Sequence, residues 1–323
     1  MKRILSGIQP SGSFHIGNYF GMMRKMIEHQ ETADLFCFIA NYHAMTSLSE
    51  GPALAQGTFD AAVTFLALGL DPAKSTFWVQ SDLPEVQELT WILSTLAPMG
   101  LLERCHSYKD KVARGIAANH GLFAYPVLMA ADILLFQSHV VPVGRDQKQH
   151  LEVARDLAIK FNFTYGDTFI VPEAEIDDEV AVVPGVDGQK MSKSYGNAIY
   201  IFTDRPTLKK AVMSIVTDAT PVEATKDPDK CNLFAIYKLF LDKAAREALR
   251  DRYLAGGLKY SDVKKELIEA IWTYFEPHRR RREELLARRD DVLDILREGA
   301  RKARAAGADT LAEVRKRAGL VYW

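Results

Sequence analysis

Residues 4–18 read ILSGIQPSGSFHIGN. Ile4 to Ile8 form a short apolar run, residues 9–12 are turn-forming, and the last four residues begin a helical pattern. A strand, a glycine-containing turn and a helix start, in this order, present backbone N–H groups to phosphates. The stretch therefore predicts a strand–turn–helix unit that binds phosphate and opens an α/β domain.

The chain that follows alternates apolar β-like runs with helical patterns. The predicted strands are 35–40, 76–80 and 139–144, and the helical patterns between and after them cover 53–68, 86–96 and 151–158. Such alternation predicts a Rossmann-like, doubly wound parallel sheet with helices on both faces. In such sheets ligands bind beyond the carboxyl ends of the strands, which is where the turns at 9–18 and 144–147 are expected.

From about Pro206 the pattern becomes helical throughout, which predicts a second, all-helical domain. The expected helices are 208–216, 233–240, 244–254, 260–275 and 277 to about 305. Residues 201–323 hold 26 Lys+Arg against 20 Asp+Glu, whereas the whole chain holds 41 against 42. A basic C-terminal part fits a polyanion partner, and a solvated helical surface explains the same numbers equally well.

Bulk composition is that of an ordinary soluble protein. The chain has 323 residues, 48% of them hydrophobic, and a net charge of −1, so two domains with cores are expected. Cys37, Cys105 and Cys231 make no paired spacing, which argues against a zinc site or a disulfide framework. Neither a signal region nor an apolar run of the roughly 20 residues needed to span a bilayer is present, and a cytoplasmic location is expected.

A second motif, Lys190-Met191-Ser192-Lys193-Ser194, follows the last predicted strand. Activation of a carboxylate by ATP needs positioning and positive charge where pyrophosphate develops, and lysine ammonium groups bind phosphate as point charges. The alternative is an exposed loop. Lys109 and Lys111 are further phosphate ligands or, as the residues alone favour, part of a solvated loop.

The first helix start carries its own candidates for nucleotide binding. His15 and Asn18 are able to donate to phosphate oxygens, and Gly17 lets a flat base approach the backbone. The alternative for His15 is a capping or surface histidine.

Asp132 interrupts the apolar segment 128–136. A buried carboxylate is costly unless something donates to it. The donor is either a partner within the core or a ligand with an N–H or O–H group, and the segment alone leaves both open. Tyr125 and Met129 share its predicted helix face.

The turn 143–150 ends a strand and starts a helix. Gly144 permits close approach, while Asp146 and Gln147 suit ribose hydroxyls or an α-amino group. A helix with Asp146 in its first turn is compatible with that role.

Five segments in this order, 6–12, 15–19, 128–135, 142–150 and 190–194, resemble tryptophanyl-tRNA synthetases of the bacterial type. The resemblance covers about the first 200 residues. It implies a class I synthetase that makes tryptophanyl-adenylate from ATP and L-tryptophan, then transfers the amino acid to the terminal ribose of tRNA(Trp). It also implies Mg²⁺, a homodimer and a helical domain that reads the anticodon, without membrane or DNA partners and without a zinc or iron–sulfur cluster.

With this resemblance the expected domains are a Rossmann-like catalytic domain over 1–200, a helical anticodon-binding domain over 201–300 and a C-terminal helical tail over 301–323 that packs back on the catalytic domain. The implied catalytic residues are His15, Asn18, Lys109, Lys111, Lys190 and Lys193. The implied ATP-binding residues are Gln9, Pro10, Ser11, Gly17, Asn18, Gly144, Arg145, Asp146, Lys190, Met191, Ser192, Lys193 and Ser194. The implied tryptophan-binding residues are Gly7, His43, Tyr125, Met129, Asp132, Val141, Val143 and Gln147, with Asp132 accepting the indole N–H.

Two positions depart from the family pattern. Leu5 stands where an aromatic residue against the indole is expected, and the lysine loop continues Tyr195-Gly196-Asn197 rather than with an acidic residue and proline. The competing interpretations are a tyrosyl-tRNA synthetase, a nucleotidyltransferase and a non-catalytic RNA-binding paralogue. The run Arg279–Arg282 contacts tRNA phosphates or, as its neighbouring glutamates favour, begins a solvated helix.

Overall fold

The computed structural model describes the chain from Met1 to Trp323 except residues 11, 114–118, 145–146 and 176–182. The chain forms two compact units, described one at a time. The first comprises residues 1–12, 26–177 and 285–323, and the second comprises residues 13–25 and 178–284. Residues 178–200 thus belong to the same unit as the helical residues up to 284, whereas the helical residues 285–323 belong to the first unit. The expected functional division at residues 200 and 300 stays a prediction.

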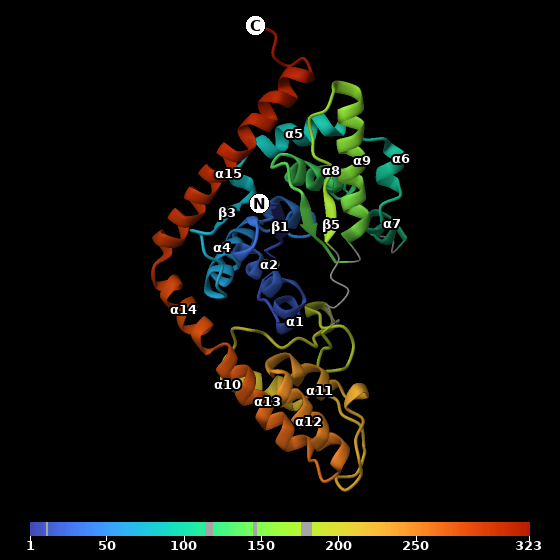
Figure 1. Cartoon of the computed structure of the whole chain (residues 1–323), viewed down its shortest axis with the longest axis vertical. Coiled ribbons are helices and arrows are strands. Elements are labelled where there is room, and N and C mark those ends of the chain that lie inside the picture. Colours follow the sequence, from blue (N-terminus) through green and yellow to red (C-terminus); the bar gives the residue numbers. More distant parts are fainter. Residues whose placement is uncertain (11, 114–118, 145–146, 176–182) are drawn as a thin grey trace. The chain divides into compact units, whose positions relative to one another are not determined.

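The first unit is built on a five-stranded parallel sheet, visible in Figure 1. Its strands are β1 (Arg3–Ile8), β2 (Asp34–Ile39), β3 (Ser75–Val79), β4 (Val140–Pro142) and β5 (Glu173–Glu175). The order is β3-β2-β1-β4-β5, so strand order reverses beside β1, the position at which ligands bind in doubly wound sheets. The predicted parallel sheet is confirmed. Strand β5 was not predicted because its sequence, Glu-Ala-Glu, carries no apolar run.

Helices cover this sheet. They are α3 (Asn41–Ala44), α4 (Gly51–Ala67), α5 (Glu85–Ser94), α6 (Met99–Glu103), α7 (His106–Ala113), α8 (His120–Leu134), α9 (Lys148–Tyr165) and α15 (Arg289–Arg317). Helix α8 packs against both α5 and α9, and its inward face joins the main hydrophobic core. That packing brings Asp132 into the core on an apolar helix.

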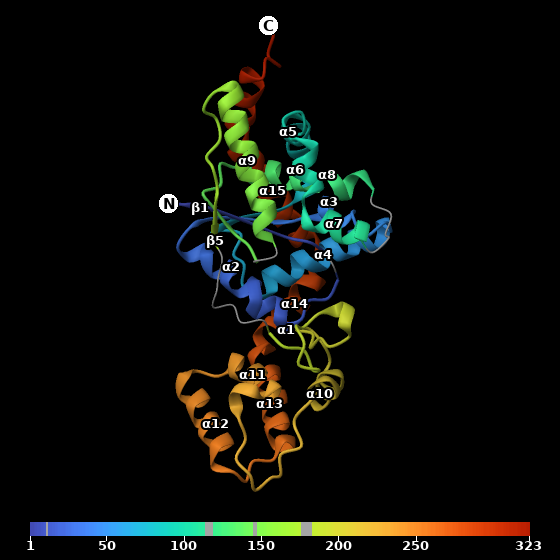
Figure 2. The same cartoon turned by 90° about the vertical axis from the view of Figure 1, so that its right-hand side faces the viewer.

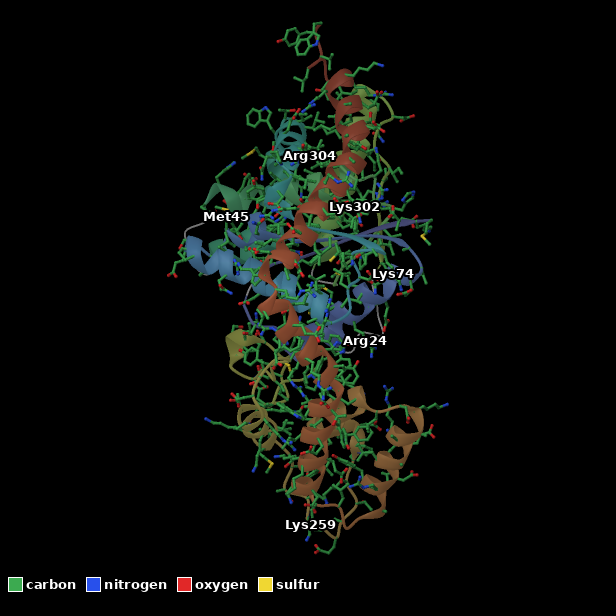
Figure 3. All side chains as sticks on the ribbon, turned by 90° about the vertical axis from the view of Figure 1, so that its left-hand side faces the viewer. Arg24, Met45, Lys74, Lys259, Lys302 and Arg304 are labelled. Carbon is green, nitrogen blue, oxygen red and sulfur yellow. The ribbon has the colours of Figure 1, made fainter. Side chains whose placement is uncertain are left out.

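The long helix α15 crosses strand β3 at very close range. A Cβ at Gly299 would lie 1.7 Å from the carbonyl oxygen of Phe77, so only glycine fits there. Arg304, labelled in Figure 3, bonds Glu85 at 2.8 Å, and Arg315 bonds Glu88 at 2.6 Å, both on α5. One helix from 277 to about 305 was expected. The structure instead has α14 (Glu276–Ala287) and α15, separated at Arg288, whose ψ of 58° is not helical.

The second unit is helical, as Figure 2 shows for α10 to α13. It contains α1 (Ile16–Asn18), a π-helical turn (Tyr19–Met23), α10 (Arg205–Met213), α11 (Asn232–Tyr237), α12 (Lys243–Ala255), α13 (Tyr260–Tyr274) and most of α14. Helix α2 (Arg24–Glu28) begins in this unit. Tyr19 contacts the rings of Tyr274 and Phe275, which attaches the turn after α1 to helix α13. Within the residues that the structure describes, no helix has both the length and the apolar composition to cross a membrane.

Candidate functional site

Asp132 lies at the centre of a buried hydrogen-bond network in the first unit. His43 Nε2 is 2.8 Å from its Oδ2, and Gln80 Nε2 donates to Oδ1 at 2.9 Å and to Oδ2 at 2.8 Å. The three residues are 3%, 7% and 0% exposed in the order Asp132, His43, Gln80. The core therefore does supply donors to this carboxylate, one of the two alternatives that the sequence left open.

The ends of two neighbouring parallel strands place these donors. His43 lies on α3, directly after β2, and Gln80 directly follows β3. The two turns are tied by a reciprocal pair of bonds: Asn41 Nδ2 donates to Ser81 Oγ at 2.8 Å, and the Ser81 N–H donates to Asn41 Oδ1 at 3.1 Å. Strand pairing thus places the turns after β2 and β3, which carry His43 and Gln80, side by side.

Burial raises the pKa of the Asp132 carboxyl, and the hydrogen bonds from His43 and Gln80 oppose that shift. A carboxylate has about four lone-pair sites, so the two protein donors leave room for a further N–H donor. The arrangement is suited to accepting a hydrogen bond from a ligand N–H group in apolar surroundings.

A second polar chain runs from α8 to the start of α9. His150 is buried, and its Nδ1 lies 3.0 Å from Gln147 Oε1 while its Nε2 meets the hydroxyl of Tyr125. With the Gln147 oxygen as acceptor, Nδ1 donates and Nε2 accepts from Tyr125. The ring of Tyr125 also lies 6.2 Å from that of His43. The structure therefore brings Tyr125, Gln147 and His43, all predicted site residues, into one neighbourhood through a histidine to which the sequence assigned no role.

Three further predicted tryptophan-site residues belong to the same core, whereas Gly7 is exposed. Val141 is buried in it, and Met129 and Val143 pack against it half-buried. A Cβ at Gly7 would lie 2.5 Å from the ring of Phe38, so the ring of Phe38 requires glycine at this position. Leu5, where an aromatic residue was expected, is 2% exposed and pairs in register with Phe36 of β2.

In the second unit, His15 caps helix α1. Its Nδ1 accepts from the Asn18 N–H at 3.2 Å, and its own N–H donates to Asn18 Oδ1 at 3.1 Å. This capping box confirms the capping alternative for His15 without excluding ligand binding, because Nδ1 as acceptor leaves the proton of the neutral ring on Nε2. Burial, followed by the charge of Lys193, lowers the pKa of His15 to about 4. The imidazole is therefore neutral at physiological pH.

Main-chain hydrogen bonds join the segment after the lysine loop to this helix start and hold the loop itself against residue 183. The Ile16 N–H donates to Ile199 at 2.9 Å, and the Met191 N–H donates to Val183 at 2.9 Å. A Cβ at Gly17 would lie 3.2 Å from the Cβ of Met191, so glycine allows the two segments to pack closely. The structure thus brings together the two motifs that begin 175 residues apart in sequence.

Asn197 organises the loop from within. This side chain is 2% exposed, accepts from the Ser192 N–H at 2.8 Å, and donates to Asp187 at 2.7 Å and to the Lys190 carbonyl at 3.2 Å. The Nζ of Lys193 lies 5.5 Å from the centroid of the Phe14 ring, and burial lowers the pKa of Lys193. The ammonium of Lys193 is thereby held beside the helix start that carries His15.

Other predicted ATP-site positions are less informative. Gln9 and Gly144 are exposed at strand ends, Pro10 is buried, and Lys109 is exposed on α7. Ser11, Arg145 and Asp146 lie outside the described residues, as does the side chain of Lys111. The three cysteines are buried and free, and the described residues contain no group of three or more His, Cys, Asp or Glu placed to hold a metal ion.

A cavity of about 540 Å³ opens in the first unit among α5, α6 and α8. Tyr125 belongs to its lining, and Asp132 does not. Its lining includes Trp91, Met99 and Met45, which are 72%, 63% and 58% exposed. These are large apolar side chains on an accessible surface.

Comparison with known proteins gives a consistent result. Residues 1–276 match the family model of tRNA synthetases class I (W and Y). The chain is 54% identical to the tryptophan–tRNA ligase of Campylobacter jejuni, over 98% of this chain and 100% of that protein, and 53% identical to that of Fusobacterium nucleatum, over 99% of each. A crystal structure of the Campylobacter jejuni tryptophanyl-tRNA synthetase complexed with ADP and tryptophan superposes with a TM-score of 0.93 at 54% identity, covering 98% of this chain and 99% of that one. The Mycoplasma pneumoniae enzyme superposes with a TM-score of 0.84 at 33% identity, covering 99% and 98%.

Proposed function

The chain belongs to the class I tRNA synthetases of the W and Y family, and its activity is tryptophan–tRNA ligation. We propose that the residues described above carry out this reaction as follows. The enzyme joins the carboxylate of L-tryptophan to the α-phosphate of ATP, releasing pyrophosphate, and then transfers tryptophan to the terminal ribose of tRNA(Trp). The buried Asp132 network is the observation that carries the assignment of the amino-acid site, because a carboxylate with a spare acceptor position binds an aromatic ring that carries an N–H or O–H donor, and in tryptophan that donor is the indole N–H.

The tryptophan site is proposed around Asp132. Its carboxylate accepts the indole N–H, and Met129, Val141, Val143 and Gly7 shape the apolar surroundings. Tyr125 and Gln147, joined through His150, hold the amino and carboxylate end of the substrate. A site built to bond an N–H rejects a ligand lacking it by about 10⁴–10⁵, whereas apolar fit alone gives about 10–200-fold.

The ATP-binding residues are proposed at the helix start and the lysine loop. His15 Nε2–H and the Asn18 amide donate to phosphate oxygens, and Lys190 and Lys193 stabilise the charge that develops on the departing pyrophosphate. Residues 191, 192 and 194 complete the loop, with Lys109 and Lys111 as further phosphate ligands. Gln9, Pro10, Ser11, Gly17, Gly144, Arg145 and Asp146 are proposed to contact the base and ribose.

Magnesium enters as part of the substrate. Mg²⁺ keeps several waters and is held in nucleotide sites largely by phosphate oxygens, with few protein ligands. The ion supplies charge neutralisation on the phosphates, and the protein's own residues orient the two substrates.

A charging assay tests the proposal. Purified enzyme, ATP and tRNA(Trp) transcript should form tryptophanyl-tRNA from labelled tryptophan and should form no tyrosyl-tRNA from labelled tyrosine with tRNA(Tyr). Charging by tyrosine would reassign the pocket to the other aromatic amino acid of this family, and charging by neither would favour a non-catalytic RNA-binding role.

Helix α14 is proposed to contribute little to tRNA phosphate binding, although tRNA is a substrate. Arg279 lies over the ring of Trp272 at 3.7 Å, and Arg281 bonds Glu284 at 2.9 Å. Arg280 pairs with Glu276. These side chains thus have partners within the unit.

The double variant Arg280→Ala/Arg281→Ala is therefore expected to bind tRNA(Trp) with an unchanged salt dependence, within about 0.3 in the slope of log K against log salt. Arg297→Ala/Arg301→Ala, whose arginines are also exposed and paired within their own helix, serves as the matched control. Two lost phosphate contacts would lower the slope by about 1.4–1.8, and that result would assign these arginines to the tRNA-binding surface.

The enzyme is proposed to act as a cytoplasmic homodimer without DNA or membrane partners. The exposed apolar side chains around the cavity, Met45 among them (Figure 3), form a patch of the kind that marks protein interfaces. A second copy of the chain is the proposed occupant.

Trp91→Lys is expected to weaken self-association about 30-fold or more, since a tryptophan at an interface centre commonly contributes 2 kcal/mol or more. Sedimentation velocity across a concentration series measures it. Phe163→Lys, which removes a side chain 91% exposed on α9 outside the cavity, is the control and should sediment as wild type. An unchanged dimer in Trp91→Lys would place the interface elsewhere.

A further inference from the structure

Gln80 is fully buried and connects two parts of the tryptophan site. Its Oε1 accepts from the backbone N–H of Tyr42 at 3.0 Å. Because a backbone N–H only donates, this bond determines which end of the amide is oxygen, and Nε2 must face Asp132. The orientation of the Gln80 amide is thus set by the main chain of the segment that also carries His43.

The contact with Asp132 spans the whole carboxylate. Gln80 Nε2 lies 2.9 Å from Oδ1 and 2.8 Å from Oδ2, whereas His43 reaches Oδ2 alone. The terminal torsion of an aspartate is broad, so a single partner on one oxygen does not fix the plane of the carboxylate. A donor placed against both oxygens does fix it.

We propose that Gln80 is a positioning residue for amino-acid specificity: by bonding both oxygens of Asp132, it holds the carboxylate in the orientation that accepts the indole N–H. The inference rests on the proposed role of Asp132 as the indole acceptor. Neither Gln80 nor its turn carries a motif, and its contribution follows from the geometry of the β2 and β3 ends.

The matched control lies one residue along the chain. Ser81 occupies the same turn and loses a hydrogen bond to Asn41 when replaced by alanine, but it makes no bond to Asp132 in the network. A general loosening of the turn would affect Ser81→Ala and a Gln80 variant alike. A positioning role affects the Gln80 variant alone.

The test compares tryptophan with β-(benzothiophen-3-yl)alanine, in which sulfur replaces the indole N–H at nearly the same shape. The ratio of kcat/KM for the two amino acids is measured by ATP–pyrophosphate exchange for wild type, Gln80→Met, Ser81→Ala and Asp132→Asn. Gln80→Met should lower the preference for tryptophan about 10- to 100-fold, the size of effect expected when a contact group is displaced by about 1 Å. Ser81→Ala should keep it within about twofold, and Asp132→Asn should lower it about 10²–10³-fold.

The outcomes separate the two proposals. Loss of preference in Asp132→Asn with full preference in Gln80→Met would overturn the role of Gln80 alone. Equal use of both amino acids by wild type would overturn the role of Asp132 and that of Gln80 with it. If Gln80→Met shows no cooperative thermal transition, Gln80→Asn replaces it, since its amide is one methylene too short to reach Asp132. In that variant the extra rise in Tm that tryptophan gives over the isostere should be smaller than in wild type, and an undiminished difference would overturn the inference.

Discussion

Lys193→Ala is expected to lower kcat for tryptophan-dependent ATP–pyrophosphate exchange about 10²–10³-fold while changing KM for tryptophan little. The ammonium lies beside the helix start that carries His15, and burial lowers its pKa, so its charge acts in a poorly solvated position. A charge of this kind stabilises the transition state more than the ground state, because pyrophosphate gains negative charge as its bond to the α-phosphate breaks.

Steady-state exchange with varied ATP and varied tryptophan separates the two constants. Lys259→Ala, an exposed lysine of the same unit labelled in Figure 3, is the control and should retain wild-type rates. A Lys193→Ala enzyme with normal kcat and only a raised KM for ATP would show that the lysine binds ground-state nucleotide and takes no part in stabilising the transition state.

Asp132→Asn is expected to reduce kcat/KM for tryptophan about 10²–10³-fold. The substitution keeps the shape but replaces one acceptor oxygen by an NH₂ group, which would face the donors of His43, Gln80 and the indole. A lost hydrogen bond to a charged group and a buried donor without an acceptor together cost about 3–4 kcal/mol, and each factor of ten corresponds to about 1.4 kcal/mol. Exchange kinetics on the purified variant measure the effect.

Asp156→Asn is the matched control, the same substitution on an exposed residue of α9. It should leave kcat/KM unchanged. The melting temperature of each variant distinguishes a damaged core from a damaged site, because an unfolded fraction lowers kcat for every substrate and leaves KM unaltered. If Asp132→Asn retained wild-type kcat/KM for tryptophan, another group would be the acceptor of the indole N–H.

The sheet was accessible from sequence because buried parallel strands are nearly continuous apolar runs. Strands β1 to β4 follow that pattern, and β5 does not, since Glu-Ala-Glu forms a strand only through pairing with β4. The sequence did not predict the helix break at Arg288 either. Residues 277–305 have helical composition throughout, and only the backbone dihedrals of one residue divide them.

For the candidate site, sequence identified the groups that carry chemistry and missed those that position them. Asp132 is conspicuous as a charge within an apolar helix, whereas Gln80 ends a strand and looks like an ordinary boundary residue. A polar side chain at the carboxyl end of strand β3 was the available signal, because ligands bind beyond the carboxyl ends of the strands in such sheets. The sequence carried no such signal for Asn197, because its hydrogen-bond partners at 187, 190 and 192 come together only once the loop has folded.

Amino-acid-dependent ATP–pyrophosphate exchange by the wild-type enzyme, with tryptophan, tyrosine and phenylalanine compared at equal concentrations, tests the central claim most directly. The account predicts exchange with tryptophan and a rate for phenylalanine, which has no ring N–H, lower by about 10⁴ or more. Comparable exchange with tyrosine or phenylalanine would contradict it, because the Asp132 network would then not be selecting the indole.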